Sequence, residues 1–175
     1  MADAFTLWIS SNLAEKSRAH GAETYPHECC GALLGLDRDV LESSGSETLT
    51  GPSAKPTREI LGLFPLVNRR DDSPRNRFSV TSEDVMSAEK AAREQNLDVV
   101  GWYHSHPDHP ARPSEYDRDH AWPWYSYIIV SVQNAAPQSM TSWRLNDDRA
   151  EFSPEGIEFR HRAAVQVGGS SRTEN

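Results

Sequence analysis

The sequence predicts a single domain that mixes helices and strands. Its 175 residues are enough to bury one sizeable core, and this length favours one domain over two. Short apolar runs, typical of buried strands, alternate along the chain with amphipathic patterns typical of helices. The chain ends in a polar run rich in Gly and Ser, which is typical of a frayed terminus. We therefore expect an α/β domain over residues 1–165 and a disordered tail over residues 166–175.

The first half begins with a helix and a hairpin. Residues 9–22 predict an amphipathic helix that ends at or just past Gly21. The apolar run at residues 29–36 predicts a buried strand. The next segment, residues 37–57, is rich in Ser, Thr, Gly and Pro and predicts a hairpin with a long exposed turn. A second strand is expected at residues 60–67.

The second half alternates in the same way. After a short strand at residues 78–80, Thr81 stands three residues before an acid, as in a capping box, and predicts a helix to about Gln95. Apolar runs predict strands at residues 97–104 and 126–132. Two further strands are expected at residues 142–145 and 157–160.

The cysteines and the N-terminus indicate a cytoplasmic protein. Cys29 and Cys30 are adjacent and therefore poorly placed to join distant parts of the chain by disulfides. We expect both as small buried side chains in a strand, which fits a reducing compartment. The N-terminus shows no secretory signal, and no run approaches the ~18 apolar residues that cross a bilayer. No membrane partner is expected.

The formal net charge of −8 counts against a broad surface for phosphate backbones, so we expect no nucleic-acid partner. The arginine-rich segment at residues 68–77 is diluted by two aspartates and is typical of a solvated loop. A local role of this segment in gripping a partner stays open.

Two histidines at the end of a predicted strand could share a metal ion. His104 and His106 lie two residues apart, and strand side chains alternate between faces, so both should point the same way. Their Cα atoms would lie about 6.5 Å apart at a rise of ~3.3 Å per residue. Two imidazoles that each bind at ~2.1 Å can close that span on one ion.

A carboxylate follows these histidines on a short predicted helix. Three prolines, Pro107, Pro110 and Pro113, restrict the connecting loop. Residues 114–117 then begin a helix with Asp117 in its first turn. Two histidines and one carboxylate are a zinc set of the catalytic kind, because three protein ligands leave the fourth tetrahedral position for water.

Purely structural interpretations compete with a metal site. Hydrogen bonds in a core or on a surface could satisfy both histidines, and Ser114 and Asp117 could form only a capping box. His109 lies three residues after His106, and His120 lies three after Asp117 on the same helical face, so either could replace a ligand.

Other polar and aromatic side chains surround the candidate ligands in the sequence. Four carboxylates are interpreted as solvated surface groups: Glu23, Asp108, Glu115 and Asp119. Three tryptophans are expected to pack in the core, although they could contact a substrate: Trp102, Trp122 and Trp124.

Two blocks of the sequence resemble the JAMM zinc metalloproteases, whose domains are called MPN or Mov34/JAB. The pattern from His104 to Asp117, which is His-Ser-His-Pro, six residues, Ser, two residues and Asp, resembles the JAMM signature. Residues 25–35, Tyr-Pro-His-Glu-Cys-Cys-Gly-Ala-Leu-Leu-Gly, resemble the upstream glutamate segment of prokaryotic members. Asn68 also follows the layout of those members. The resemblance covers about residues 5–160.

The resemblance implies an α/β (α+β) fold in which a curved, mostly antiparallel sheet is flanked by helices, with the cytidine-deaminase-like architecture of MPN/JAB domains. It implies a zinc-dependent peptidase or isopeptidase with Zn²⁺ held by His104, His106 and Asp117. Relatives act on the C-terminal Gly-Gly tails of ubiquitin or of ubiquitin-like sulfur carriers, or on conjugates made through those tails. Such a protein is the expected partner, and a homodimer is left open.

The residues that match the family motif also suggest catalytic roles. Glu28 would take a proton from the attacking water and hand it to the departing amine without ligating the metal. The Ser114 hydroxyl would donate a hydrogen bond to the oxygen that gains charge. Ser105 points to the opposite face of the strand and is expected to pack or to form hydrogen bonds behind the site.

Substrate recognition is less defined by the sequence. An extended tail could add as a strand to a sheet edge. Residues 43–57 and 68–77 are the candidate segments to hold this tail. A small sulfur carrier is the first choice of substrate, because the short chain has little room for added insertions, and a bacterial ubiquitin-like conjugate is the second. Two other functions stay open: a non-catalytic MPN scaffold, and a metal-dependent hydrolase of DNA or small molecules. Other divalent ions could replace zinc at such ligands.

Overall fold

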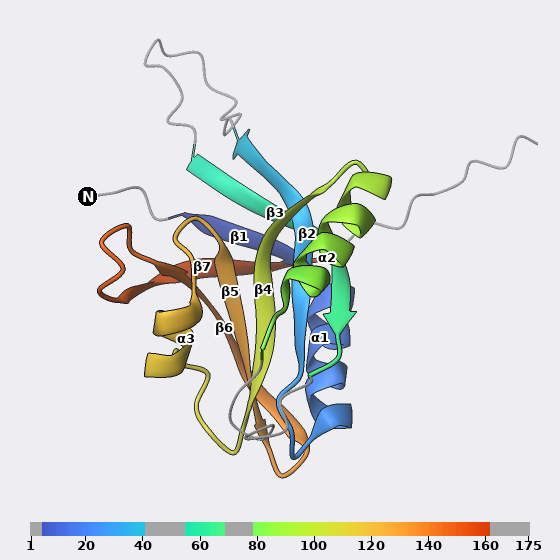
Figure 1. The fold of residues 1–175 in the computed structure, drawn as a ribbon, viewed down its shortest axis with the longest axis vertical. Coiled ribbons are helices and arrows are strands. Elements are labelled where there is room, and N and C mark those ends of the chain that lie inside the picture. The colour runs from blue at the N-terminus through green and yellow to red at the C-terminus, as the bar shows by residue number, and fades with distance from the viewer. Residues whose placement is uncertain (1–4, 41–54, 69–78, 162–175) are drawn as a thin grey trace, which may run out of the picture.

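The computed structural model describes residues 5–40, 55–68 and 79–161 (Figure 1). The expected tail, the centre of the expected hairpin turn and nearly all of the arginine-rich segment lie outside these ranges. Within them, no helix combines the length and the apolar character needed to span a bilayer.

The strands of the described residues close into one barrel. They are β1 (Thr6–Ser10), β2 (Cys30–Val40), β3 (Lys55–Leu66), β4 (Asp98–Pro107), β5 (Ser126–Gln133), β6 (Ala136–Leu145) and β7 (Phe152–Arg160). Their order around the barrel is β1-β3-β2-β4-β5-β6-β7, and β1 closes it by pairing with both β3 and β7.

Most neighbouring strands in the barrel are antiparallel. The β1–β3, β1–β7 and β4–β5 pairs are parallel. The β2–β3, β2–β4, β5–β6 and β6–β7 pairs are antiparallel. The predicted α/β fold with a curved, mostly antiparallel sheet is therefore confirmed.

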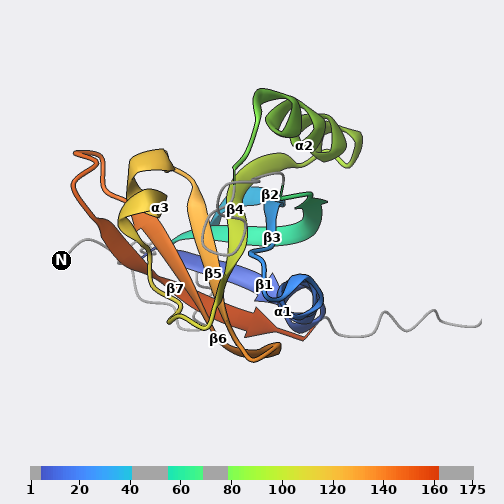
Figure 2. The same ribbon diagram turned by 60° about the horizontal axis from the view of Figure 1, so that its bottom comes forward.

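The helices of the described residues are α1 (Ser11–Thr24), α2 (Ser82–Glu94) and α3 (Glu115–His120). Each begins after a serine or threonine, Ser10, Thr81 or Ser114, whose side-chain oxygen accepts a backbone N–H of the first turn. At Thr81 the Asp84 carboxylate completes the predicted capping box. Figure 2 shows α2 on the outer side of β2 and β4, with α1 beside β1.

The N-terminal prediction was wrong in one respect. Residues Thr6–Ser10 form a strand, so the first helix begins at Ser11 instead of Ile9. Leu7 and Ile9 are both buried, because β1 lies between two parallel neighbours and directs these alternate side chains inward. A strand of five residues is too short for its alternation to stand out beside the helical pattern that follows.

All but one of the remaining predicted elements are formed, and the strands are longer than predicted. Ser79 and Val80 belong to no strand, although a strand was predicted at residues 78–80. Phe78 lies outside the described residues. The two described residues instead lead directly into the N-cap of α2.

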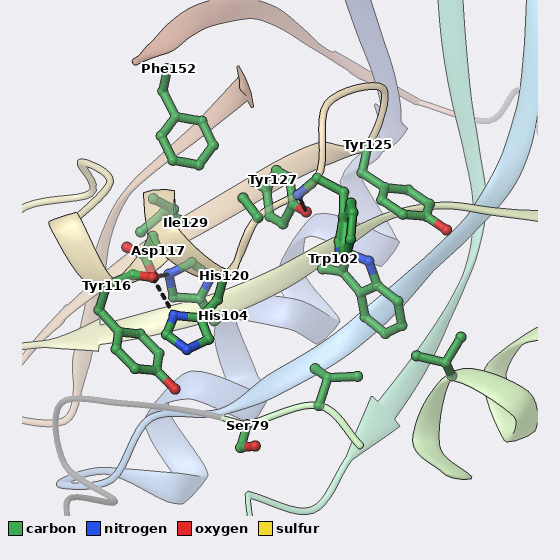
Figure 3. A pocket seen from close by; sticks show the side chains of 14 residues that line it. Ser79, Trp102, His104, Tyr116, Asp117, His120, Tyr125, Tyr127, Ile129 and Phe152 are labelled. Atoms are coloured by element: carbon green, nitrogen blue, oxygen red, sulfur yellow. Dashed lines mark hydrogen bonds and ion pairs between the residues drawn. The ribbon is translucent and has the colours of Figure 1, made fainter. Parts of the chain in front are cut away.

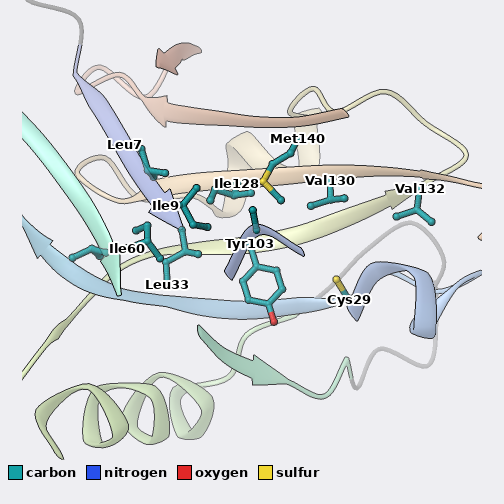
Figure 4. Packing of buried hydrophobic residues seen from close by; sticks show 12 residues of the cluster. Leu7, Ile9, Cys29, Leu33, Ile60, Tyr103, Ile128, Val130, Val132 and Met140 are labelled. Carbon is teal, nitrogen blue, oxygen red and sulfur yellow. The ribbon is translucent and has the colours of Figure 1, made fainter. Parts of the chain in front are cut away.

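Two apolar clusters cover the two faces of the central strands. The first lies inside the barrel and beneath α1 (Figure 4), and it contains Leu7, Ile9, Ala14, Cys29, Leu33, Ile60, Val100, Tyr103, Ile128, Val130, Val132 and Met140. The second lies on the outer faces of β2, β4 and β5, against α2, and includes Cys30, Ala32, Leu34, Ala88, Ala92, Trp102 and Tyr127. Because both faces are covered, these strands read in the sequence as continuous apolar runs. Both cysteines are buried and free, as predicted.

Candidate metal centre

The end of β4 brings two imidazoles together on the outer face of the barrel. His104 and His106 are both buried, and their Nε2 atoms lie 3.1 Å apart. They share a face because they are two residues apart in a strand. At this distance both Nε2 atoms can reach one shared ion.

Asp117 completes the cluster from the first turn of α3. Its Oδ1 lies 3.2 Å from Nε2 of His104, and its Oδ2 lies 3.3 Å from Nε2 of His106. The Ser114 N–H donates to Oδ2 at 2.7 Å, and the Asp117 N–H donates to the Ser114 hydroxyl at 3.1 Å. The predicted capping box is therefore present, and it fixes the carboxylate that faces the histidines.

The spacing of these three side chains fits a tetrahedral metal ion. Ligand atoms that each lie ~2.0 Å from zinc are separated from one another by about 3.3 Å in a tetrahedron. The two Nε2 atoms lie 3.1 Å apart, and each lies 3.2 to 3.3 Å from a different oxygen of Asp117. Among the described residues, His104, His106 and Asp117 form the only group of three or more histidine, cysteine or acidic side chains with this convergence. The donor set therefore fits zinc with one position left for water.

A backbone contact orients one of the imidazoles. His106 Nδ1 lies 3.0 Å from the Pro110 carbonyl oxygen. A carbonyl oxygen can only accept, so Nδ1 carries the hydrogen and Nε2 keeps its lone pair toward the cluster. The loop between β4 and α3 thus sets the tautomer that a metal ligand needs.

The charge states of the cluster also suit metal binding. Burial lowers the pKa of His104 and favours the neutral imidazole that binds metal ions. Burial alone would raise the pKa of Asp117, but the two imidazoles outweigh it and hold that pKa below its usual range. The Asp117 carboxylate is therefore ionised beside the two imidazoles.

Glu28 lies on the same face, just before β2. Cys30 pairs with His104 in the antiparallel β2–β4 ladder, so continuing that ladder by two residues places Glu28 opposite His106. Glu28 is buried, and burial together with the negative charge of Asp117 raises its pKa to about 9. This carboxyl can hold a proton at neutral pH beside the candidate ligands.

Three hydrogen bonds fix the backbone around Glu28. The Asn68 side-chain amide donates to the Glu28 carbonyl at 3.1 Å. The Cys29 N–H donates to the Ser105 hydroxyl at 2.8 Å, while the Ser105 N–H donates to the Cys29 carbonyl at 3.1 Å. Ser105 thus lies on the opposite face from the histidines and forms hydrogen bonds behind the site, as predicted.

A family model of prokaryotic homologues of the JAB domain matches residues 10–146. The chain belongs to this family. Desampylase of Haloferax volcanii is 31% identical over 121 residues, which cover 69% of this chain and 73% of that protein. Lys-63-specific deubiquitinase BRCC36 of Mus musculus is 28% identical over 111 residues, which cover 56% of this chain but only 38% of that protein.

Two solved structures share the fold of this JAB domain. A protein from Salinibacter ruber is 39% identical, with a TM-score of 0.58, over 91% of this chain and 92% of that chain. A protein from Desulfitobacterium hafniense is 27% identical, with a TM-score of 0.68, over 93% of this chain and 97% of that chain. The predicted family and fold of the JAB domain are therefore confirmed.

The alternative ligands considered from the sequence lie outside the cluster. His109 is exposed, in the loop after β4. His120 stacks on Tyr116, with ring centroids 3.9 Å apart, and its Nδ1 lies 2.8 Å from the Tyr116 carbonyl oxygen. The four carboxylates interpreted as surface groups are all exposed: Glu23, Asp108, Glu115 and Asp119.

A cavity of about 470 Å³ opens beside His104 and Asp117 (Figure 3). We call it the aromatic pocket and define it by Trp102, Tyr116, Trp122, Tyr125, Tyr127 and Phe152. Its volume falls within the ~300–1,000 Å³ typical of ligand sites. The sequence analysis missed most of this pocket, although the two-residue spacing from Trp102 to His104 along β4 was a usable signal.

The expectation of core packing holds for only one of the three tryptophans near the site. Trp102 is buried, but Trp122 is 65% exposed and Trp124 is 49% exposed. Both exposed rings follow α3 in the connection to β5 and lie against guanidinium groups, Trp122 against Arg149 at 5.2 Å and Trp124 against Arg58 at 4.4 Å. These contacts hold the indoles at the surface.

Proposed function

We propose that this JAB domain is a zinc-dependent peptidase or isopeptidase that hydrolyses an amide bond at the C-terminal Gly-Gly tail of a ubiquitin-like or sulfur-carrier protein. The observation that carries the proposal is the convergence of His104, His106 and Asp117 on the same face as Glu28. Relatives named as a desampylase and a deubiquitinase support the choice of a ubiquitin-like substrate.

In this proposal, His104, His106 and Asp117 would hold the ion. When bound, zinc would act as a Lewis acid and lower the pKa of water at the site to about 7. The Pro110 carbonyl keeps His106 in the tautomer with a free Nε2 lone pair. The Ser114 N–H holds the Asp117 carboxylate in place.

Glu28 is the proposed acid and base. Its carboxylate takes a proton from the attacking water, and its carboxyl then gives that proton to the departing amine. In the metal-free chain burial favours the protonated form, whereas the positive charge of bound zinc would favour the carboxylate that takes the proton. The Asn68 amide and the Ser105 hydroxyl keep the Glu28 backbone in register with β4.

Ser114 is the proposed donor to the amide oxygen. Its hydroxyl accepts the Asp117 N–H as the N-cap of α3, and this leaves the hydroxyl hydrogen able to donate. A hydrogen bond to an oxygen that gains negative charge contributes about 10²- to 10³-fold to the rate.

The test is mass spectrometry of ubiquitin-like proteins, with and without a conjugated lysine, after incubation with the zinc-loaded protein. We expect a product that ends in Gly-Gly, and no such product from Glu28→Ala although that variant retains zinc. Full activity of Glu28→Ala would remove Glu28 from the mechanism.

The same experiment separates the two alternative functions. A partner-binding scaffold would retain ubiquitin-like proteins uncleaved and would bind no zinc in the parent or in His104→Ala. A hydrolase of DNA or small molecules would bind zinc and yet leave every Gly-Gly substrate intact. Either result would replace the proposal.

A further inference from the structure

The aromatic pocket lies along β4, upstream of the candidate metal centre. Trp102 and His104 both border it, and they are two residues apart on the same face of β4. Tyr127 and Ile129 repeat this spacing on β5, where they pair with Trp102 and His104. The pocket therefore extends along the strand from His104 to Trp102, over about 6.6 Å at ~3.3 Å per residue.

Glu28 marks the other end of the site. It lies opposite His106 in the continued β2–β4 ladder and does not border the aromatic pocket. The candidate ligands thus lie between the pocket at the Trp102 end and Glu28 at the His106 end. Since the departing amine must come within reach of Glu28 to receive its proton, the acyl part of the substrate extends toward the pocket.

The register of an extended tail matches this spacing. In a tail X-Gly-Gly, the residue X lies two positions before the glycine whose carbonyl carbon is attacked. At ~3.3 Å per residue, its Cα lies about 6.6 Å from the Cα of that glycine. With the last glycine at the candidate ligands, the side chain of X reaches the position of Trp102.

The pocket lining selects the chemistry of that side chain. Apart from the candidate ligands His104 and Asp117 and the tyrosines, His120 is the only titratable side chain among the described residues that borders it, and it stacks on Tyr116. The Tyr127 hydroxyl accepts the backbone N–H of Trp122 at 2.8 Å. At the Trp102 end of the pocket, a charged side chain would therefore lose water without gaining an ionic partner among the described residues that border it.

Resting on the proposed function, we propose that the aromatic pocket binds the side chain of X and selects tails in which X is uncharged and apolar. Trp102 and Tyr127 line the pocket at the required distance, and Val85 borders it from the first turn of α2. The specificity of the domain for its ubiquitin-like partner would then be decided partly by this one residue of the tail.

The experiment compares conjugates of the form X-Gly-Gly joined to lysine, with X as Leu, Arg or Glu. We expect kcat/KM for the Leu tail to exceed that for either charged tail by about tenfold or more, as apolar pockets typically discriminate. Isothermal titration of the free X-Gly-Gly acids against chelator-treated protein should give the same order of affinity.

A charge introduced at the pocket should reverse the preference. Val85→Asp places a carboxylate at the pocket in the first turn of α2, where an acid is tolerated because of the helix dipole. We expect this variant to favour the Arg tail over the Leu tail. Met86→Asp is the matched control, because Met86 is 68% exposed on the same turn and does not border the pocket. If Val85→Asp does not fold, Phe152→Asp tests the opposite wall.

Each result bears on one of the two proposals. Hydrolysis at equal rates for all three tails, unchanged in Val85→Asp, would overturn the pocket assignment and leave the proposed function standing. If no tail is hydrolysed, the proposed function fails, and the binding order of the free acids alone decides the assignment of the pocket. A reversed preference in the variant supports the assignment, because structural damage would not raise activity toward the Arg tail.

Discussion

Glu28 occupies surroundings that disfavour its charged form. Burial, followed by the charge of Asp117, raises its pKa from 4.5 to about 9. In the unfolded chain the carboxyl ionises near pH 4.5, whereas the folded metal-free chain keeps its proton up to about pH 9. The free energy of unfolding therefore loses a contribution from Glu28 as the pH rises through this window.

Glu28→Gln should remove that loss, because the amide has nearly the same shape and no charge. In metal-free protein, the free energy of unfolding of the variant relative to the parent should rise by about 1 kcal/mol or more between pH 5 and pH 8. A shift of one pKa unit corresponds to about 1.4 kcal/mol. Urea unfolding at the two pH values measures this difference. Glu151→Gln is the control, since Glu151 is exposed. Parallel pH profiles for Glu28→Gln and parent would contradict the assigned burial effect.

Ser105 should act on catalysis through the position of Glu28. Ser105→Ala removes the acceptor of the buried Cys29 N–H, which should cost about 1–3 kcal/mol of stability. It should lower kcat by up to about 100-fold, as small displacements of reacting groups do, with little change in KM. Ser17→Ala is the control, because the buried Ser17 hydroxyl bonds only within α1, to Ala14. An unchanged kcat in Ser105→Ala would mean that this hydrogen bond does not position Glu28.

At the scale of single elements, the segments nearest the site were the most predictable. β4 was visible as an apolar run that ends in His-x-His, and α3 was visible from its capping box. Both signals are local in the sequence, so β4 and α3 can be recognised without knowledge of the fold. β1 was missed because it has only five residues, and its two buried ones, Leu7 and Ile9, are covered through pairing with β3 and β7, which are distant in sequence.

The capping boxes of α2 and α3 allow stability and catalysis to be separated. Ser114→Ala and Thr81→Ala each remove an N-cap hydroxyl, and each should cost about 1 kcal/mol of stability. Only Ser114→Ala should also lower kcat, by about 10²- to 10³-fold, if the hydroxyl donates to the amide oxygen. Thermal unfolding and steady-state kinetics on both variants measure the two effects. Equal kinetic losses would show that Ser114 serves α3 alone.

At the scale of the whole molecule, strand pairing brings Glu28 to the histidines, which lie far from it in the sequence. Glu28 meets His106 through the β2–β4 ladder, and Asp117 arrives through the α3 crossover between the parallel strands β4 and β5. The order of the motif in the sequence predicted which three side chains converge, and their role as metal ligands stays a prediction. The aromatic pocket was not predictable, because α2, β4, α3, β5 and β7 assemble its wall through non-local contacts.

Metal binding should stabilise the whole domain. An ion that binds the folded chain alone raises the free energy of unfolding by about 2.7 kcal/mol at 100 times Kd. We expect chelator treatment to lower Tm and zinc to restore it. His106→Ala should abolish the zinc-dependent rise, whereas exposed His109→Ala should retain it. A zinc-dependent rise of parental size in His106→Ala would place the ion elsewhere.

Anomalous X-ray diffraction at the zinc absorption edge, on crystals of the zinc-loaded chain, would locate the ion itself. We expect one anomalous peak bound by His104 Nε2, His106 Nε2 and an Asp117 carboxylate oxygen, with no fourth protein ligand and with Glu28 nearby but not coordinated. A peak at other residues, or a fourth protein side chain in the remaining position, would contradict this expectation.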